Sequence, residues 1–351
     1  MIKMMKRGRA VWILATLIAL AAVSSACGTE DLLGSSEGLS LKDFGTLQVV
    51  AEGSEPTKVE APSGAVSMLV VLEGAPRTQL VQVKKITSPS GTVVFDFDNG
   101  PKTNFASTTD GLYSVLIPSS PDVSFESGEW QLTYLTDGGP FTGEVRAAIK
   151  TKSGDNSLDL NLFFAGNLGV TAATAKDDAR FQAVLSDAEA LFGKAGISFG
   201  EVNYEDLSTA DAETYSIVSL ANGEAELDAL FKLSAGKSNR ALNFFFVADL
   251  EGNNQGFSLL GRAGGVPGPA SFHGTHRSGV VINMADFIAA ASGDEAAQEA
   301  ARKTTRLIMV HEAAHYLGLF HTTERNGQAL GDATIVGQDP IPDTALCADS
   351  A

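Results

Sequence analysis

The chain has 351 residues, of which 44% are hydrophobic and 19% charged, and its formal net charge at pH 7 is −17. A chain this acidic repels nucleic acid and anionic membrane surfaces, which excludes both as electrostatic partners. The charge is best explained by solubility. The length is sufficient for two domains with full hydrophobic cores. With only two cysteines, disulfides contribute little to the fold.

Residues 1–27 are predicted to be a signal peptide. Basic residues precede an apolar run at 10–23, which is too short to persist as a membrane-spanning helix. The small residues before Cys27 resemble a bacterial lipoprotein processing site, at which Cys27 becomes the lipidated first residue. Ser24 stands where such sites usually have Leu, and the alternative is ordinary cleavage near Ala26 that leaves Cys27 as a free thiol. Both routes export the protein. Lipidation would anchor it in the bacterial cell envelope, at the outer membrane or cell surface, whereas ordinary cleavage would secrete it.

Residues 28–40 are rich in Gly, Ser, Asp and Glu, and we expect a flexible tether there. Over 41–150, short β-rich runs alternate with turn residues, which predicts a β-sandwich. The expected strands are 46–51, 66–72, 79–87, 92–97, 112–117, 130–136 and 143–149. Trp130 is interpreted as a core residue rather than a ligand platform, because apolar and polar residues alternate around it. The sandwich contains no His or Cys, so we expect it to position or recognise rather than to catalyse.

A polar break at 151–156 precedes the second domain, 157–351, in which strands and helices alternate. The expected strands are 158–165, 197–204, 241–248 and 279–284, and the expected helices are 181–192 and 294–317. The first helix has amphipathic spacing, and the run 241–248 is apolar enough for the centre of a sheet. The expected fold class is therefore multidomain, an all-β sandwich followed by an α/β (α+β) domain with helices on a mixed sheet.

His273 and His276 have the H-x-x-H spacing of a possible second metal pair. No carboxylate or cysteine lies close to them in the sequence, so they are interpreted as solvent-facing histidines. The glycine-rich stretch before them, 252–269, which continues to His273 and His276, has two interpretations. It is either a flexible surface loop or a segment whose backbone approaches another chain closely.

Three of the five histidines lie in the segment HEAAHYLGLFH at 311–321. On a helix, His311 and His315 are one turn apart and face the same point. Glu312 is placed to reach a water molecule on the metal, and Gly318 allows the helix to end so that His321 returns as a third ligand. Three imidazoles with an open fourth position indicate a catalytic zinc site, whereas structural zinc has four protein ligands. The alternative is a chance H-E-x-x-H on an ordinary helix.

The segment resembles the H-E-x-x-H-x-x-G-x-x-H signature of the metzincin zinc metallopeptidases, and the residues after it resemble their pappalysin-like branch. The close likeness covers 307–347, including Asp339, Asp343 and Cys347, and a weaker likeness of element order reaches back to 157. The resemblance implies an endopeptidase with Glu312 as general base for a zinc-activated water. It also implies that the stretch from 252 to 269, continuing to His276, forms a cleft wall with an edge strand that pairs with extended peptide substrates.

One departure from the metzincin pattern is the absence of methionine after Met309, because the family carries a methionine turn beneath the metal. We expect a catalytic domain truncated at its C-terminus, a different support for the histidines, or a degraded enzyme. Asp339 and Asp343 are possible calcium ligands, although paired carboxylates in a proline-rich turn are more often solvated turn residues.

The sequence therefore predicts an exported zinc metalloendopeptidase that acts on peptide or protein substrates. The rival hypothesis is a weak or inactive protease-like lipoprotein that binds a partner through its sandwich. A third is another class of zinc hydrolase. The sequence carries no signal for an oligomeric state.

Overall fold

The computed structural model describes residues 31–36, 38–99, 110–119, 123–152, 156–221, 223–237, 241–252 and 259–320. The predictions on the signal peptide, Cys27, His321, Asp339, Asp343, Cys347 and the methionine turn lie outside these residues. Within them, no helix is long and apolar enough to cross a membrane. The described chain forms two antiparallel sheets followed by an α/β region with a mixed sheet, so the coarse fold class is confirmed.

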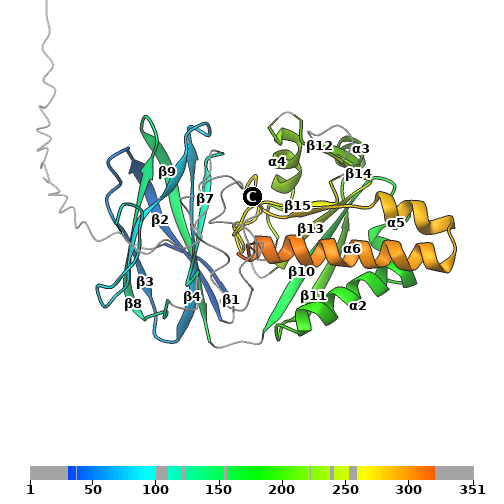
Figure 1. The fold of residues 1–351 in the computed structure, drawn as a ribbon, viewed down its shortest axis with the longest axis horizontal. Coiled ribbons are helices and arrows are strands. Elements are labelled where there is room, and N and C mark those ends of the chain that lie inside the picture. Colours follow the sequence, from blue (N-terminus) through cyan, green and yellow to red (C-terminus); the bar gives the residue numbers. More distant parts are fainter. Residues whose placement is uncertain are drawn as a thin grey trace, which may run out of the picture.

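The first domain consists of two antiparallel sheets, shown in Figure 1 beside the α/β domain. One sheet has the order β1 (Asp31–Ser36), β2 (Leu39–Val49), β9 (Phe141–Thr151), β4 (Ala65–Ala75) and β7 (Leu112–Ile117). The other has the order β3 (Thr57–Ala61), β8 (Gly128–Thr136), β5 (Val81–Thr87) and β6 (Val93–Asp96). Alternate residues of the inner strands β4 and β8, such as Val70, Leu72, Leu132 and Tyr134, face the core between the sheets. Trp130 is completely buried there, and its indole N–H donates to the Glu126 carbonyl at 2.8 Å, which confirms it as a core residue.

Two features of this domain differ from the sequence prediction. Residues 31–36 pair with β2, and β2 begins at Leu39, so the expected tether is wrong over this part. Glycine and serine composition indicated a tether, but backbone pairing to an existing strand needs no apolar side chains. Strand β3 was also missed, because it has five residues and only its alternate positions, Thr57, Val59 and Ala61, are buried.

The second domain is built on a five-stranded sheet of order β11 (Ser198–Asp206), β10 (Ser157–Ala165), β13 (Ala241–Val247), β16 (Val280–Asn283) and β15 (Gly261–Ala263). The first four strands are parallel, and β15 is antiparallel to β16 at the edge. Every residue of β13 is buried, which confirms it as the central strand. Smaller elements are β12 (Ile217–Ser219), β14 (Asp249–Glu251), α1 (Ala172–Ala175), α3 (Thr209–Tyr215), α5 (Ala285–Ala289) and the 3-10 turn Ala290–Ser292.

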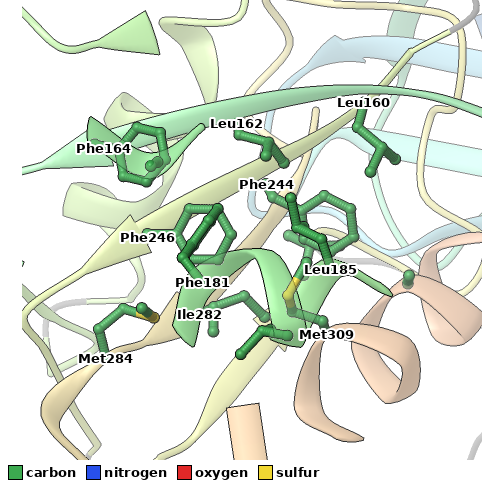
Figure 2. Packing of buried hydrophobic residues seen from close by; sticks show 14 of the residues in the cluster. Leu160, Leu162, Phe164, Phe181, Leu185, Phe244, Phe246, Ile282, Met284 and Met309 are labelled. Atoms are coloured by element: carbon green, nitrogen blue, oxygen red, sulfur yellow. The ribbon is translucent and has the colours of Figure 1, made fainter. Parts of the chain in front are cut away.

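Helices cover both faces of this sheet. On one face, α2 (Ala179–Gly193) and α6 (Glu295–Tyr316) pack on alternate strand residues, as Figure 2 shows for Phe181 and Met309 against Phe244 and Phe246. On the other face, α4 (Ala225–Lys232) packs on the intervening residues, among them Phe245. The C-terminal end of α6 points toward the sandwich (Figure 1). The sheet thus fixes the helix that carries the predicted metal ligands.

The segment 264–279, named here the junction loop, lies between the two domains. Its Phe272 is 4% exposed and packs on an apolar patch of the sandwich. That patch consists of Leu41, Leu69, Val71, Leu112 and Ala148. The Arg146 guanidinium lies 5.0 Å from the centre of the Phe272 ring. This part of the glycine-rich region is therefore an interdomain contact and not a flexible surface loop.

A partly buried charge cluster joins the domains beside Phe272. Arg277 of the junction loop forms ion pairs with Asp110 of the sandwich and with Glu224, the N-cap residue of α4. His276 is 0% exposed, so the interpretation of it as solvent-facing is wrong. Its Nδ1 lies 3.7 Å from Glu73 Oε1 and its Nε2 lies 3.9 Å from Asp110 Oδ1. Both carboxylates come from the sandwich, far away in the sequence, which is why they were not anticipated.

The cluster shifts the pKa values of its members in opposite directions. Burial opposes the charged form of His276, but Asp110 and Glu73 outweigh it, so the pKa of His276 lies above its ordinary 6.5. Burial likewise opposes ionisation of Glu73, yet His276 and Arg146 hold the pKa of this carboxyl below its ordinary 4.5. The junction therefore favours the protonated form of His276 and the ionised form of Glu73 more strongly than water does.

We predict that the domain junction loses stability as the pH rises above the ordinary His276 pKa of 6.5. The His276 contribution is complete below its unfolded pKa of about 6.5 and is lost as the pH rises through its raised folded pKa. The loss amounts to about 1.4 kcal/mol for each pKa unit of difference. Urea unfolding between about pH 6 and about pH 9 measures it. His276→Gln should flatten this slope, and His273→Gln should not. An unchanged slope in His276→Gln contradicts the assignment.

Candidate metal centre

Helix α6 presents the two described histidines on the side opposite its buried face. It begins at the N-cap Asp294, whose Oδ1 accepts from Ala297 N at 2.9 Å. Buried residues recur every three or four positions along it: Ala301, Thr305, Met309, Ala313 and Tyr316. These buried residues form one face of the helix, which packs against the sheet. His311 lies on the opposite face and is exposed.

The two imidazoles converge on one point. His311 Nε2 and His315 Nε2 are 3.2 Å apart, and the rings are 4.6 Å apart at 83°. Two imidazole nitrogens on a tetrahedral zinc ion, each at 2.0–2.1 Å from it, stand about 3.3 Å apart. The spacing of the pair therefore fits a shared zinc ion, although it also fits a direct hydrogen bond between the rings.

The tautomer of His315 is fixed by the backbone. Its Nδ1 lies 2.7 Å from the carbonyl oxygen of Leu319. A carbonyl only accepts hydrogen bonds, so the neutral ring donates from Nδ1 and keeps its lone pair on Nε2. Metal-ligating histidines usually have such a second hydrogen bond, which orients the ring. His315 thus has the orientation and tautomer of a zinc ligand.

The turn after α6 supplies this carbonyl. Leu319 N donates to Ala314 O at 2.9 Å and Gly318 N donates to His315 O at 2.8 Å, the paired bonds of a Schellman motif. Gly318 has a φ of 104°, a conformation that residues with a Cβ rarely adopt. The predicted role of Gly318 in ending the helix and turning the chain is confirmed.

Glu312 lies between the helix and the edge strand of the sheet. A Cβ atom on Gly261, the first residue of β15, would stand 2.8 Å from Glu312 Cγ and 2.6 Å from Ile308 Cγ2. Only glycine allows β15 to lie this close to α6. Glu312 is therefore half-buried beside an edge strand, one residue after a histidine of the pair.

The structure brings three of the predicted site residues together and leaves the fourth undescribed. His311, Glu312 and His315 share one end of α6, whereas His321 lies outside the described residues. Within 31–320, as far as the structure describes it, no group of three or more His, Cys, Asp or Glu side chains could hold a metal ion. His273 and His276 do not form a second pair, because His273 Nδ1 is 2.7 Å from Asn243 Nδ2 while His276 lies among carboxylates.

Two contributors to the site were not anticipated from the sequence. The Leu319 carbonyl is a backbone group, so no side chain marks it, although the L-G-L sequence at 317–319 is compatible with a Schellman turn. Gly261 lies in the glycine-rich stretch. Only its close approach to Ile308 and Glu312 of α6 distinguishes it from the neighbouring glycines.

No family model matches the sequence, and no curated protein matches it. One similar solved structure is a Bacillus licheniformis lipase in propeptide form, at 11% identity and a TM-score of 0.21, over 35% of this chain and 24% of the lipase. This chain thus spans about a quarter of that protein's length. Another is a carbohydrate-binding module in complex with galactotriose, at 14% identity and a TM-score of 0.19. The match covers 32% of this chain and 71% of the module. A third is a family two carbohydrate esterase from Cellvibrio japonicus, at 11% identity and a TM-score of 0.17. The match covers 62% of this chain and 78% of the esterase. Likeness at these TM-scores carries no argument about function.

We predict that the chain binds one zinc ion and that His311 and His315 are required for it. Elemental analysis after reconstitution and dialysis measures the stoichiometry. The double variant His311→Ala/His315→Ala should lose the zinc, and His321→Ala should bind it more weakly while remaining folded. His273→Gln is the matched control and should retain one equivalent, since His273 contacts Asn243 instead of the pair. A full equivalent in the double variant contradicts the assignment.

Proposed function

We propose that the protein is an exported zinc-dependent endopeptidase. The observation that carries the proposal is the 3.2 Å separation of His311 Nε2 and His315 Nε2, with Glu312 adjoining them beside an edge strand. The resemblance of 311–321 to the metzincin signature supports the same chemistry. His311, His315 and His321 are the residues that would hold the ion. When bound, zinc would lower the pKa of a water molecule and polarise the scissile carbonyl.

Glu312 is the residue we assign to proton transfer. Its carboxylate accepts a proton from the attacking water as the water oxygen bonds to the carbonyl carbon. When the C–N bond breaks, the same carboxyl passes this proton to the amine nitrogen, so that the products are a carboxyl group and a free amine. His315 contributes orientation, because its bond to the Leu319 carbonyl holds its ring in place throughout.

The substrate class follows from the sheet edge. Strand β15 has β16 as its only strand partner among the described residues, so an extended peptide can add to its other side. Gly261 places this strand against Glu312, which would bring a paired peptide to the proton-transfer group. The exposed Leu307 and Leu319 lie before and after the histidine pair and suit apolar peptide side chains.

We predict that the purified chain hydrolyses an unfolded casein-type substrate and that Glu312 is essential. Glu312→Gln should lower kcat/KM by about 100-fold to 10,000-fold, because it removes the general base and leaves the histidines in place. Glu295→Gln in the first turn of the same helix is the matched control and should keep full activity. A chelator should abolish cleavage and zinc should restore it.

Other results of this assay decide between the hypotheses. Cleavage that survives Glu312→Gln would exclude the proposed mechanism. Stoichiometric zinc without cleavage of any substrate in a broad protein panel would favour the protease-like binding protein instead.

We further predict that export ends with a lipid anchor at Cys27, from the N-terminal sequence alone. Two or more acyl chains make a stable anchor, since each buried methylene contributes about 0.8 kcal/mol. Mass spectrometry of the mature N-terminus should find a diacylated or triacylated Cys27, and Cys27→Ser should move the protein to the soluble fraction. An unmodified Cys27 in membrane-free protein would establish secretion.

A further inference from the structure

The C-terminal end of α6 is held from two sides by segments outside the helix. On one side the junction loop approaches Tyr316, which is 3% exposed. Gly268 N donates to Tyr316 O at 2.9 Å. A Cβ on Gly268 would stand 2.1 Å from Tyr316 Cδ2 and Cε2, so the backbone of the loop lies directly on the tyrosine ring. Glycine is required at 268 for space alone.

On the other side the sandwich touches the turn that follows the helix. A Cβ on Gly318 would stand 3.1 Å from Leu116 Cδ2 of β7 and 3.7 Å from Pro267 Cβ. Leu116 is partly buried against the apolar patch of the sandwich that receives Phe272. Gly318 therefore lies against both the sandwich and the junction loop.

These contacts connect the sandwich, step by step, to His315, a predicted metal ligand. Leu116 supports Gly318, the turn at Gly318 places the Leu319 carbonyl, and that carbonyl fixes the His315 ring. On the other side, Gly268 supports Tyr316, the residue next to His315. Close packing in protein interiors transmits strain along such contacts.

We propose that the sandwich is a structural part of the metal centre, with Leu116 and Gly268 as positioning residues for His315. The inference rests on the proposed zinc function and gives the sandwich a role in it. Phe272 and the Arg277–Asp110 ion pair keep the two domains docked, so that Leu116 stays against Gly318. The sandwich then acts on the chemistry without contacting substrate.

The test compares zinc affinity in Leu116→Ala and in Val115→Ala. Val115 is the neighbouring residue on β7, but its side chain is 0% exposed in the core between the two sheets of the sandwich. Both substitutions remove apolar contacts of the same domain, and only the first removes a contact to the turn after α6. Competition with a chromophoric chelator, at a temperature where every variant is folded, gives the dissociation constant.

We expect Leu116→Ala and Gly268→Ala to weaken zinc binding about 10-fold to 100-fold, the usual effect of losing a residue that orients a metal ligand. Val115→Ala should lower the melting temperature and leave the affinity within about twofold. Leu116→Met, which keeps the volume of the side chain, should restore most of the affinity. Wild-type affinity in Leu116→Ala, or an equal loss in Val115→Ala, would overturn the proposal.

A second readout does not depend on zinc. In the metal-free protein, the exchange rate of the His315 Nδ1 proton reports the hydrogen bond to Leu319 O, and NMR can measure it. Leu116→Ala should accelerate this exchange at least about tenfold, and Val115→Ala should not. If the wild-type chain binds no zinc, the proposed function fails, and this exchange rate alone decides whether the sandwich positions His315.

Discussion

The hydrogen bond from His315 Nδ1 to the Leu319 carbonyl is the interaction on which the candidate site depends. It exists because α6 ends in a Schellman turn, and that turn requires the positive φ of Gly318. The bond leaves the Nε2 lone pair of His315 directed toward His311 Nε2, which lies 3.2 Å away. One backbone conformation therefore sets both the tautomer and the direction of the His315 ring, a predicted metal ligand.

The rest of the fold keeps this helix end in place. The buried ridge of α6 is fixed on the sheet, whose central strand β13 has no exposed residue. The junction loop and β7 then hold the last turn from outside, and an apolar contact at Phe272 together with the Arg277–Asp110 ion pair docks the sandwich. Apolar burial supplies most of the free energy of such a junction, whereas the partly buried charges set its geometry.

Short-range patterns in the sequence predicted most of what is local in this structure. The i, i+4 histidines, the helix end at Gly318 and the apolar run of β13 each depend on neighbouring residues, and each is where it was expected. Contacts between distant segments were not predictable in this way. His276 was misplaced because Glu73 and Asp110 reach it from the other domain. For the same reason, nothing in the sequence showed that Gly268 faces Tyr316.

The central claim is that His311 and His315 bind one zinc ion through nitrogen. X-ray absorption at the zinc edge of the reconstituted protein tests it most directly. The account predicts nitrogen or oxygen scatterers at about 2.0–2.1 Å and the outer-shell pattern of several imidazoles, reduced in His311→Ala. A sulfur scatterer at about 2.3 Å, or a spectrum that His311→Ala leaves unchanged, would contradict the claim.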